Sequence, residues 1–406
     1  MLNLLSYLFL VLAIFLLVPS AVLLLQSVAA WLPPSAPSSG VAVKPDACRV
    51  CILMPAHNEA LGIEKILTSL LTQLSSQTRL LVVADNCSDN TAALVRAVAA
   101  GVHPIDVVER QHAELRGKGF ALDFGVRHLA QDPPDVVLVL DADCEVEGDA
   151  IPKLVVACLQ YQRPAQALYL MRNPPGVSVK GRLAEFAWVV KNWVRPLGFH
   201  RLGLPCQLMG TGMAFGWKHI SQATLATGHI VEDMQLGLDL ARNGAAPRFC
   251  PQALVTSYFP QSAEGIQAQR TRWEHGHMGI ILSEVPTLLW QSLLQTNRTL
   301  FGMALDLCVP PLALLVLMLL TLLLASSGLW FWSGSVGGHA MRMACLSLAM
   351  VASATAIAWM RFGRDAISFM QLCAVPLYVI GKIPLYFYFL VKRQASWVRS
   401  KRDGEA

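Results

Sequence analysis

Long apolar runs occupy both ends of the chain, and a more polar middle lies between them. Residues 1–31 are predominantly apolar, and no charged side chain occurs before Lys44. Three further apolar stretches cover 306–332, 342–360 and 366–391. A helix of about 20 apolar residues can cross a bilayer, and a cleaved signal peptide would carry a basic start. We therefore predict an uncleaved N-terminal anchor and a C-terminal membrane region.

Between residues 49 and 143 the pattern changes to short apolar runs that alternate with amphipathic segments. The apolar runs are typical of buried strands and cover 49–54, 80–84, 105–108 and 136–140. The segments between them have the 3.6-residue period of helices with one buried face, and they cover 63–74, 90–100 and 118–129. This alternation predicts an α/β domain with a mixed, mostly parallel sheet and flanking helices.

Polar side chains follow several of the predicted strands. Pro55 to Glu59 follow the first, Asp85 ends the second, and Asp141 and Asp143 follow the fourth. Ligands of parallel α/β sheets collect beyond the carboxyl ends of the strands. We therefore expect these residues to share one site. A helix cap or turn is the alternative role for Asp85, because Asn-Cys-Ser-Asp follows it.

Composition supports a membrane protein and argues against a nucleic-acid partner. Apolar residues make up 54% of the chain and charged residues 15%, a balance typical of membrane proteins. The net charge of +5 comes largely from basic residues near the predicted membrane ends, which suits anionic lipid headgroups. The ten cysteines are scattered. The pair Cys48 and Cys51 has no second pair to complete a zinc site, so we interpret these cysteines as small apolar residues in a reducing compartment.

These patterns divide the chain into five parts. They are an anchor at 1–31, a Pro/Ser-rich linker at 32–48, an α/β domain at 49–280 with interfacial helices (among them 183–198), a membrane region at 281–392 and a basic tail at 393–406. Basic residues favour the cytosolic side, which places the α/β domain there. If 366–391 crossed the membrane fully, one basic cluster would lie outside. Lys382 and two prolines within that stretch favour a re-entrant or interfacial segment instead.

Two further groups of polar residues have the composition of a phosphate and metal site. Lys118, in an Arg-Gly-Lys-Gly loop before a helix, can supply a positive charge to a diphosphate. The loop matches neither a dinucleotide fingerprint nor a P-loop. Asp141 and Asp143 offer carboxylate oxygens, which Mg²⁺ and Mn²⁺ prefer and which can hold such an ion against substrate phosphates. The alternative for the two aspartates is a solvated turn.

Acidic and aromatic residues later in the chain are further candidates for a functional site. Glu232 and Asp233 begin a predicted helix, where acids also favour the helix dipole. A carboxylate can serve as a general base that deprotonates a hydroxyl group, and we assign that role to Asp233. Gln269, Arg272 and Trp273 share one helical face, and an interfacial anchor is their alternative role.

The order of these motifs resembles that of the processive-type family-two glycosyltransferases, which include cellulose, chitin, hyaluronan and poly-N-acetylglucosamine synthases and ceramide glucosyltransferase. The motifs are Pro-Ala-His-Asn-Glu at 55–59, the acids at 85, 141 and 143, Val-Glu-Asp at 231–233 (where the family has Thr-Glu-Asp) and Gln-Arg-Thr-Arg-Trp at 269–273. The resemblance covers roughly residues 49–280 and implies a GT-A-type (Rossmann-like) fold.

The resemblance also implies roles for individual residues. Donor contacts would come from Pro55, Glu59, Asp85, Lys118, Asp141 and Arg272, with Asp85 accepting from the uracil imide. Asp143 would be the direct metal ligand and Asp141 the supporting one. Acceptor contacts would come from Gly210, Thr211, Glu232, Gln269 and Trp273.

The implied function is an inverting, Mg²⁺- or Mn²⁺-dependent transfer from a UDP-sugar to a growing glycan or lipid-linked acceptor at the cytosolic membrane face. It would serve extracellular polysaccharide synthesis, alongside other polysaccharide-export components. Two alternatives stay open. One is transfer of a single sugar to a membrane lipid, and the other is a non-catalytic membrane subunit that binds glycan or nucleotide.

Overall fold

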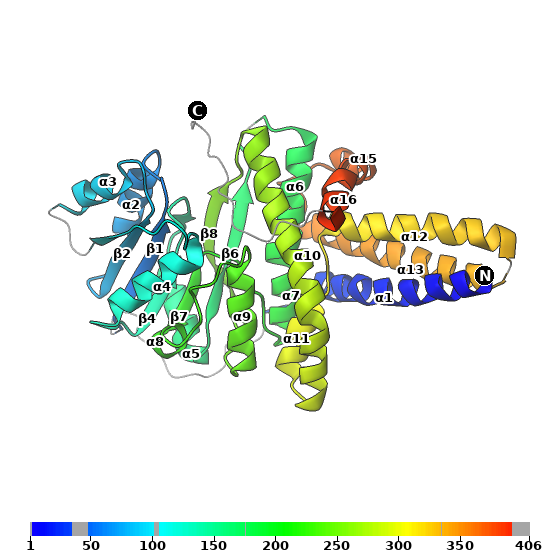
Figure 1. The fold of residues 1–406 in the computed structure, drawn as a ribbon, viewed down its shortest axis with the longest axis horizontal. Coiled ribbons are helices and arrows are strands. Elements are labelled where there is room, and N and C mark those ends of the chain that lie inside the picture. The colour runs from blue at the N-terminus through cyan, green and yellow to red at the C-terminus, as the bar shows by residue number, and fades with distance from the viewer. Residues whose placement is uncertain (1, 35–47, 101–104, 175, 334, 392–406) are drawn as a thin grey trace. The chain divides into compact units, whose positions relative to one another are not determined.

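The computed structural model describes residues 2–34, 48–100, 105–174, 176–333 and 335–391. Most of the predicted linker and the whole basic tail lie outside these residues. The described residues divide into two compact units, one formed by 48–172 and 204–273 and the other by 2–34, 173–203 and 274–391. We call the first the α/β unit and the second the helical unit (Figure 1).

The α/β unit contains a mixed sheet of eight strands within the described residues, in the order β3-β2-β1-β4-β7-β6-β8-β5. The strands are β1 Val50–Ala56, β2 Thr78–Asp85, β3 Ile105–Arg110, β4 Val136–Val139, β5 Glu145–Val146, β6 Ala165–Arg172, β7 Met213–Gly216 and β8 Arg248–Tyr258. The pairs among β3, β2, β1 and β4 are parallel, and so is β6 with β8. The short strand β7 is antiparallel to both β4 and β6 and joins the two parallel groups.

Helices of the α/β unit are α2 Ile63–Leu71, α3 Thr91–Ala99, α4 Lys118–Leu129, α5 Ala150–Tyr161, α8 Trp217–Ile220 and α9 Glu232–Arg242. The predicted strands and helices of residues 49–143 are therefore all present. The helix predicted over 63–74 ends at Leu71.

One buried core holds α4 and α9 against β1, β2, β4 and β7. Its members are mostly aliphatic and include Leu53, Val83, Leu122, Val139 and Leu236. Helix α4 lies close to β1 because Gly125 has no side chain. A Cβ there would lie 2.4 Å from Leu53 Cδ1. This close packing fixes the start of α4, where Lys118 lies, against the sheet.

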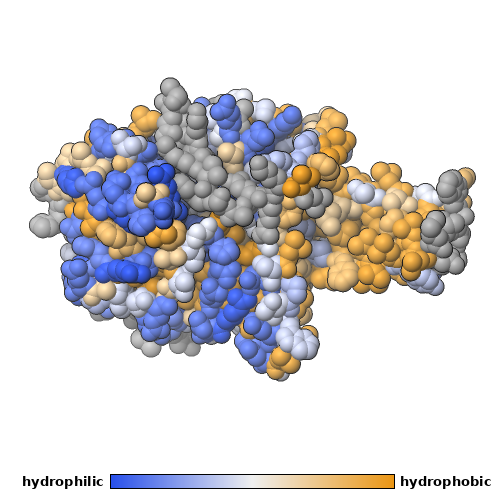
Figure 2. All heavy atoms as spheres, viewed as in Figure 1, coloured by the Kyte–Doolittle hydropathy of each residue, from blue (hydrophilic) through white to orange (hydrophobic). Residues whose placement is uncertain are grey.

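Among its described residues, the helical unit contains three helices that are long and apolar enough to cross a membrane, at Leu4–Ala29, Leu312–Phe331 and Gly338–Gly363. They belong to α1 Leu2–Ala29, α12 Leu312–Ser333 and α13 Ser335–Ala358, the last continued by the π-helical turn η3 Trp359–Gly363. Helix α13 packs against both α1 and α12. The visible surface of these helices is largely hydrophobic in Figure 2, with Phe15 70% and Leu324 74% exposed. Such a surface suits hydrocarbon.

The apolar stretches predicted from the sequence differ from the structure in two places. The stretch 306–332 is divided, because α11 Arg298–Leu307 ends before α12 begins. The stretch 366–391 forms no span-length helix and instead contains α14 Phe369–Leu372, α15 Val375–Ile380 and α16 Ile383–Val391. Pro376 and Pro384 lie in the first turns of α15 and α16, where proline is tolerated.

The helix predicted over 183–198 is present as part of a longer helix with a π-helical turn, and its location in the membrane interface stays a prediction. The longer helix consists of α6 Val179–Val189, η2 Val190–Val194 and α7 Arg195–Arg201. Its Arg195 belongs to a buried polar network with α1 and α11. Arg195 Nη2 lies 3.1 Å from Asp306 Oδ1, Arg195 Nε donates to Gln26 Oε1 at 3.2 Å, and Gln26 Nε2 donates to Asp306 Oδ1 at 2.7 Å. The three side chains therefore satisfy one another in an apolar setting.

Candidate active site

The carboxyl ends of β1, β2 and β4 bring the predicted donor residues to one edge of the sheet. The register pairs Ala56 with Ala84 and Leu53 with Val139, so the strands end near the same level. Pro55 lies within the last two residues of β1, Glu59 follows β1, Asp85 ends β2, and Asp141 follows β4. This is the edge at which ligands of such sheets bind, and the binding roles of these residues stay a prediction.

Asp85 is held by a partner that the sequence analysis missed. Arg110 Nη1 lies 2.5 Å from Asp85 Oδ1, and the two side chains are 10% and 8% exposed. His57 Nδ1 lies 2.7 Å from the Asp85 carbonyl oxygen, and the nearby Glu59 amide donates to Thr91 Oγ1 at 2.8 Å. Arg110 ends β3 directly opposite Asp85, so the strand-end rule applied to β3 could have found it. The ion pair fixes the orientation of the Asp85 carboxylate.

Lys118 connects the start of α4 with two other predicted residues. Its ammonium forms an ion pair with Asp141 and donates to the Gly210 carbonyl at 2.8 Å. Burial alone would lower the pKa of Lys118, but the carboxylates of Asp141, Glu232 and Asp233 together raise it. The lysine therefore stays charged, as a contact to a diphosphate requires.

The loop before β7 supplies Gly210 and Thr211. Thr211 is fully buried, and its hydroxyl accepts from the Asp141 amide at 3.0 Å. Gly210 has a φ of 90°, and a Cβ there would lie 3.4 Å from Asp233 Oδ2 and 3.8 Å from Lys118 Nζ. Gly210 thus allows Asp233 to lie beside the Lys118–Asp141 pair.

A buried glutamine, absent from the sequence prediction, holds this loop. Gln166 of β6 is 0% exposed. Its amide donates to the Thr211 carbonyl at 2.9 Å and accepts from the Met209 amide at 2.8 Å. The signal in the sequence was one amide side chain inside the apolar run 165–171, since a buried polar group needs partners.

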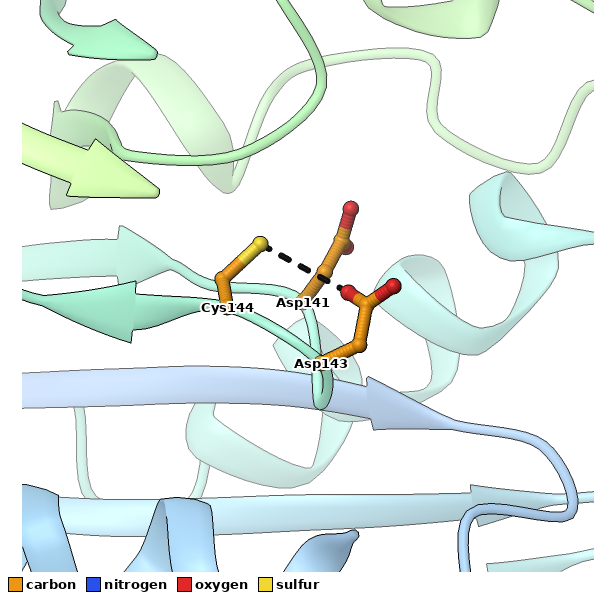
Figure 3. A group of neighbouring side chains, drawn as sticks. All are labelled: Asp141, Asp143 and Cys144. Atoms are coloured by element: carbon orange, nitrogen blue, oxygen red, sulfur yellow. Dashed lines mark hydrogen bonds between the residues drawn. The ribbon is translucent and has the colours of Figure 1, made fainter. Parts of the chain in front are cut away.

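Asp141, Asp143 and Cys144 form a group that can hold a metal ion (Figure 3). One ligand atom of each lies within 4.8 Å of the others, with Asp143 exposed and Cys144 buried. Burial and then the two carboxylates raise the pKa of the Cys144 thiol well above its usual value. The thiol stays protonated, and Cys144 Sγ lies 3.5 Å from Asp143 Oδ1. The anionic donors are therefore the carboxylates, which fit a hard cation such as Mg²⁺ or Mn²⁺.

Glu232 and Asp233 form the first turn of α9 beside Lys118. Burial, and next the neighbouring Asp233 carboxylate, raise the pKa of Glu232 to about 7, while Lys118 and Arg272 act in the opposite sense. Arg272 therefore lies close enough for its positive charge to stabilise the Glu232 carboxylate. Gln269 and Trp273 lie with Arg272 on the first part of α10 Ala263–Leu294 and are partly buried. Their assignment to the acceptor stays a prediction.

The raised pKa of Glu232 predicts how the stability of the chain depends on pH. An unfolded glutamate releases its proton near 4.5, whereas Glu232 in the folded chain keeps it to about 7. The folded state therefore binds more protons between these values, and its stability falls as pH rises through that window. Glu232→Gln mimics the protonated side chain and removes this loss. Unfolding temperatures in detergent from pH 4 to 8 should show the variant gaining on the wild type as pH rises. Curves that stay parallel across that range would contradict the assignment.

The comparisons with known proteins agree with this geometry. The family described as "Glycosyltransferase like family 2" matches residues 46–276, more than half of the chain. The chain therefore belongs to this glycosyltransferase family.

Two curated relatives match the same part of the chain. A probable glycosyltransferase, YdaM of Bacillus subtilis, is 26% identical over 247 residues, which are 58% of this chain and 56% of the relative. A poly-beta-1,6-N-acetyl-D-glucosamine synthase of Staphylococcus aureus is 24% identical over 239 residues, which are again 58% of this chain and 56% of the relative. The chain spans about half the length of the curated relatives it matches.

Among solved structures, a mannosyltransferase, PcManGT from Pyrobaculum calidifontis, in complex with GDP-Man and Mn²⁺, has a TM-score of 0.56 and 18% identity. The match covers 95% of this chain and 100% of the other. It shows a shared fold, and the predicted GT-A-type α/β fold with membrane helices is confirmed.

Proposed function

We propose that this glycosyltransferase moves a sugar from a UDP-sugar to a glycan or lipid-linked acceptor at the membrane, with inversion at the anomeric carbon. The observation that carries the proposal is the cluster around Lys118. It joins the acids after β4, the loop before β7 and the first turn of α9 at one sheet edge. The groups that we assign to the phosphates, the metal and the acceptor proton lie together there, as transfer from a nucleotide-sugar requires.

The residues that we assign to the UDP-sugar donor are chosen for the charges of their side chains. Asp85, oriented by Arg110, can accept a hydrogen bond from a nucleobase imide. Lys118 and Arg272 can neutralise the diphosphate, which carries the charge that leaves with UDP. Asp143 and Asp141 would hold Mg²⁺ or Mn²⁺, and the bound ion would stabilise the leaving diphosphate as a Lewis acid.

The acceptor half is assigned from the position of Asp233. Its carboxylate lies beside the Gly210 loop, close to the groups assigned to the diphosphate. A carboxylate there can take the proton of an acceptor hydroxyl as it attacks the anomeric carbon on the face opposite UDP. A single displacement inverts the configuration. Glu232, protonated below about pH 7, can donate a hydrogen bond to the acceptor.

A cytosolic α/β unit and three membrane crossings are part of the proposal. Trp31 follows α1, and its indole Nε1 donates to the Ile357 carbonyl at 3.3 Å. Arg361 donates to the Trp31 carbonyl at 3.3 Å. The carboxyl ends of α1 and α13 therefore lie together. If α1, α12 and α13 each cross the membrane, the chain leaves α13 on the same side of the membrane as it leaves α1. A re-entrant segment 366–391 then keeps every basic cluster on that side, as the Lys/Arg rule favours.

A screen of UDP-sugars with the purified protein in detergent tests the function. We expect UDP release from at least one UDP-sugar, with Mg²⁺ or Mn²⁺ present, and little release of GDP from GDP-mannose, because Asp85 is assigned to uracil. Similarity to a poly-beta-1,6-N-acetyl-D-glucosamine synthase makes UDP-N-acetylglucosamine the first donor to try. UDP binding without turnover of any donor would instead support the non-catalytic subunit.

Product length then separates the two catalytic alternatives. Similarity to a polymer synthase supports repeated addition. A ladder of products from one labelled acceptor would agree with a growing polysaccharide. One added sugar per acceptor would favour a glycolipid synthase.

A further inference from the structure

Lys382 interrupts the last apolar stretch of the chain, and the proposed function leaves it without a role. It lies with Gly381 between α15 and α16. A cation at such a position is costly unless it has a partner. The structure supplies one within the helical unit, because Lys382 Nζ forms an ion pair with Glu274 of α10. The two side chains are only 12% and 13% exposed. The Lys382 ammonium also lies 5.4 Å from the centroid of the Tyr378 ring.

The next residue of α10 is held by the same segment. His275 is 0% exposed, and its Nε2 lies 3.2 Å from the Leu385 carbonyl oxygen. Its ring lies 5.2 Å from the Phe389 ring, edge to face, and 6.1 Å from the Tyr388 ring. Successive residues of a helix point about 100° apart. Contacts at Glu274 and His275 therefore fix both the height and the rotation of this helical turn.

This turn directly follows the two residues assigned to the diphosphate and the acceptor, Arg272 and Trp273, in the same continuous helix. Rotation of the helix at Glu274 would turn both side chains, because no break separates them from it.

We propose that the segment 375–391 is a positioning element for the active site, which acts through the Lys382–Glu274 ion pair and the His275 contacts to set the rotation of α10 at Arg272 and Trp273. The inference rests on the proposed function. It assigns to Glu274 and Lys382 no contact with substrate. Their role is to hold Trp273 where an acceptor sugar can stack on it and Arg272 where it faces the diphosphate.

The principal variants are Lys382→Met and Glu274→Gln, which each remove one partner, and the reversed pair Glu274→Lys with Lys382→Glu. Glu264→Gln is the matched control, because Glu264 is an exposed glutamate of the same helix. Lys382→Arg keeps the charge but replaces a compact ammonium by a wider planar group. If removal of the Lys382 charge prevents folding, Lys382→Arg takes the place of Lys382→Met in the measurements.

The kinetic readout uses the UDP-sugar with the fastest UDP release and octyl β-N-acetylglucosaminide as the acceptor probe. We expect each single variant to reduce kcat/KM for the probe by roughly tenfold or more, as misplaced groups do. UDP affinity should fall as well, because Arg272 is assigned to the diphosphate, whereas affinity for uridine should stay within about twofold, because Asp85, assigned to the base, is unchanged. The reversed pair should regain most of the lost activity, and Glu264→Gln should match the wild type.

Hydrogen–deuterium exchange of peptides within residues 266–280 supplies a second readout that needs no acceptor. Exchange there should increase in the single variants and return toward the wild type in the reversed pair. Unchanged exchange, or a lower unfolding temperature with unchanged acceptor kinetics, would overturn the positioning role and leave a packing contact. Failure of the proposed function is distinct from this result, because the wild type itself would then release no UDP from any donor.

Discussion

Asp143→Asn should reduce sugar transfer by about 10³-fold or more, because several kcal/mol of charge stabilisation by the metal is lost. The amide keeps the size of the side chain but removes the charge that attracts the cation. Asp143 is the exposed carboxylate of the group after β4, and the neighbouring thiol of Cys144 is buried. UDP release at a series of Mn²⁺ concentrations measures the effect.

Asp106→Asn is the matched control for this variant. Asp106 is an exposed carboxylate near the start of β3, at the opposite end from Arg110, so its loss should leave activity near that of the wild type. Chelation of divalent ions should abolish wild-type turnover, and re-addition of Mn²⁺ should restore it. Full activity after thorough chelation would refute the metal assignment.

Asp233→Asn should lower the chemical step by roughly 10²-fold or more, the scale of a lost general base. UDP affinity should change little, because the carboxylate is assigned to the acceptor hydroxyl. Single-turnover measurements with bound donor, combined with UDP titration, separate the two effects. Glu232→Gln is the comparison at the adjacent position, and we expect it to retain more activity because Glu232 already carries a proton below about pH 7.

Two other outcomes for Asp233→Asn would change the assignment. Near-normal turnover would move the base elsewhere, with Glu232 the first alternative. Loss of UDP affinity together with turnover would mean that Asp233 holds the start of α9 and the Gly210 loop in place.

The sequence predicted those parts of the fold that local periodicity determines. The strands before Asp85 and Asp141 and the helix that begins at Lys118 follow from short apolar runs and one-sided helical faces, and all are present. The parallel pairing that brings their ends together follows from the alternation of strands and helices. These features depend on residues that are close together in the chain, so they can be predicted from a single sequence.

The contacts that shape the site were not predicted, because they join distant parts of the chain. Gln166 reaches Thr211 across 45 positions, and Lys118 reaches Gly210 across 92. Arg110 ends its strand, but only the register places it opposite Asp85. Long-range pairing of this kind is decided by packing and by the need to satisfy buried polar groups.

The buried network of Gln26, Arg195 and Asp306 bears on how the enzyme can be produced for study. Removing α1 to obtain a fragment that needs no detergent would delete Gln26, which accepts from the guanidinium and donates to the carboxylate. Buried charges that lose a partner are strongly destabilising, and the apolar surfaces of α7 and α13 that pack on α1 would become exposed. A truncated chain would therefore tend to aggregate even if its α/β unit folded. Full-length protein, kept in detergent or lipid nanodiscs, is the appropriate material for crystallisation, cryo-microscopy and inhibitor screening.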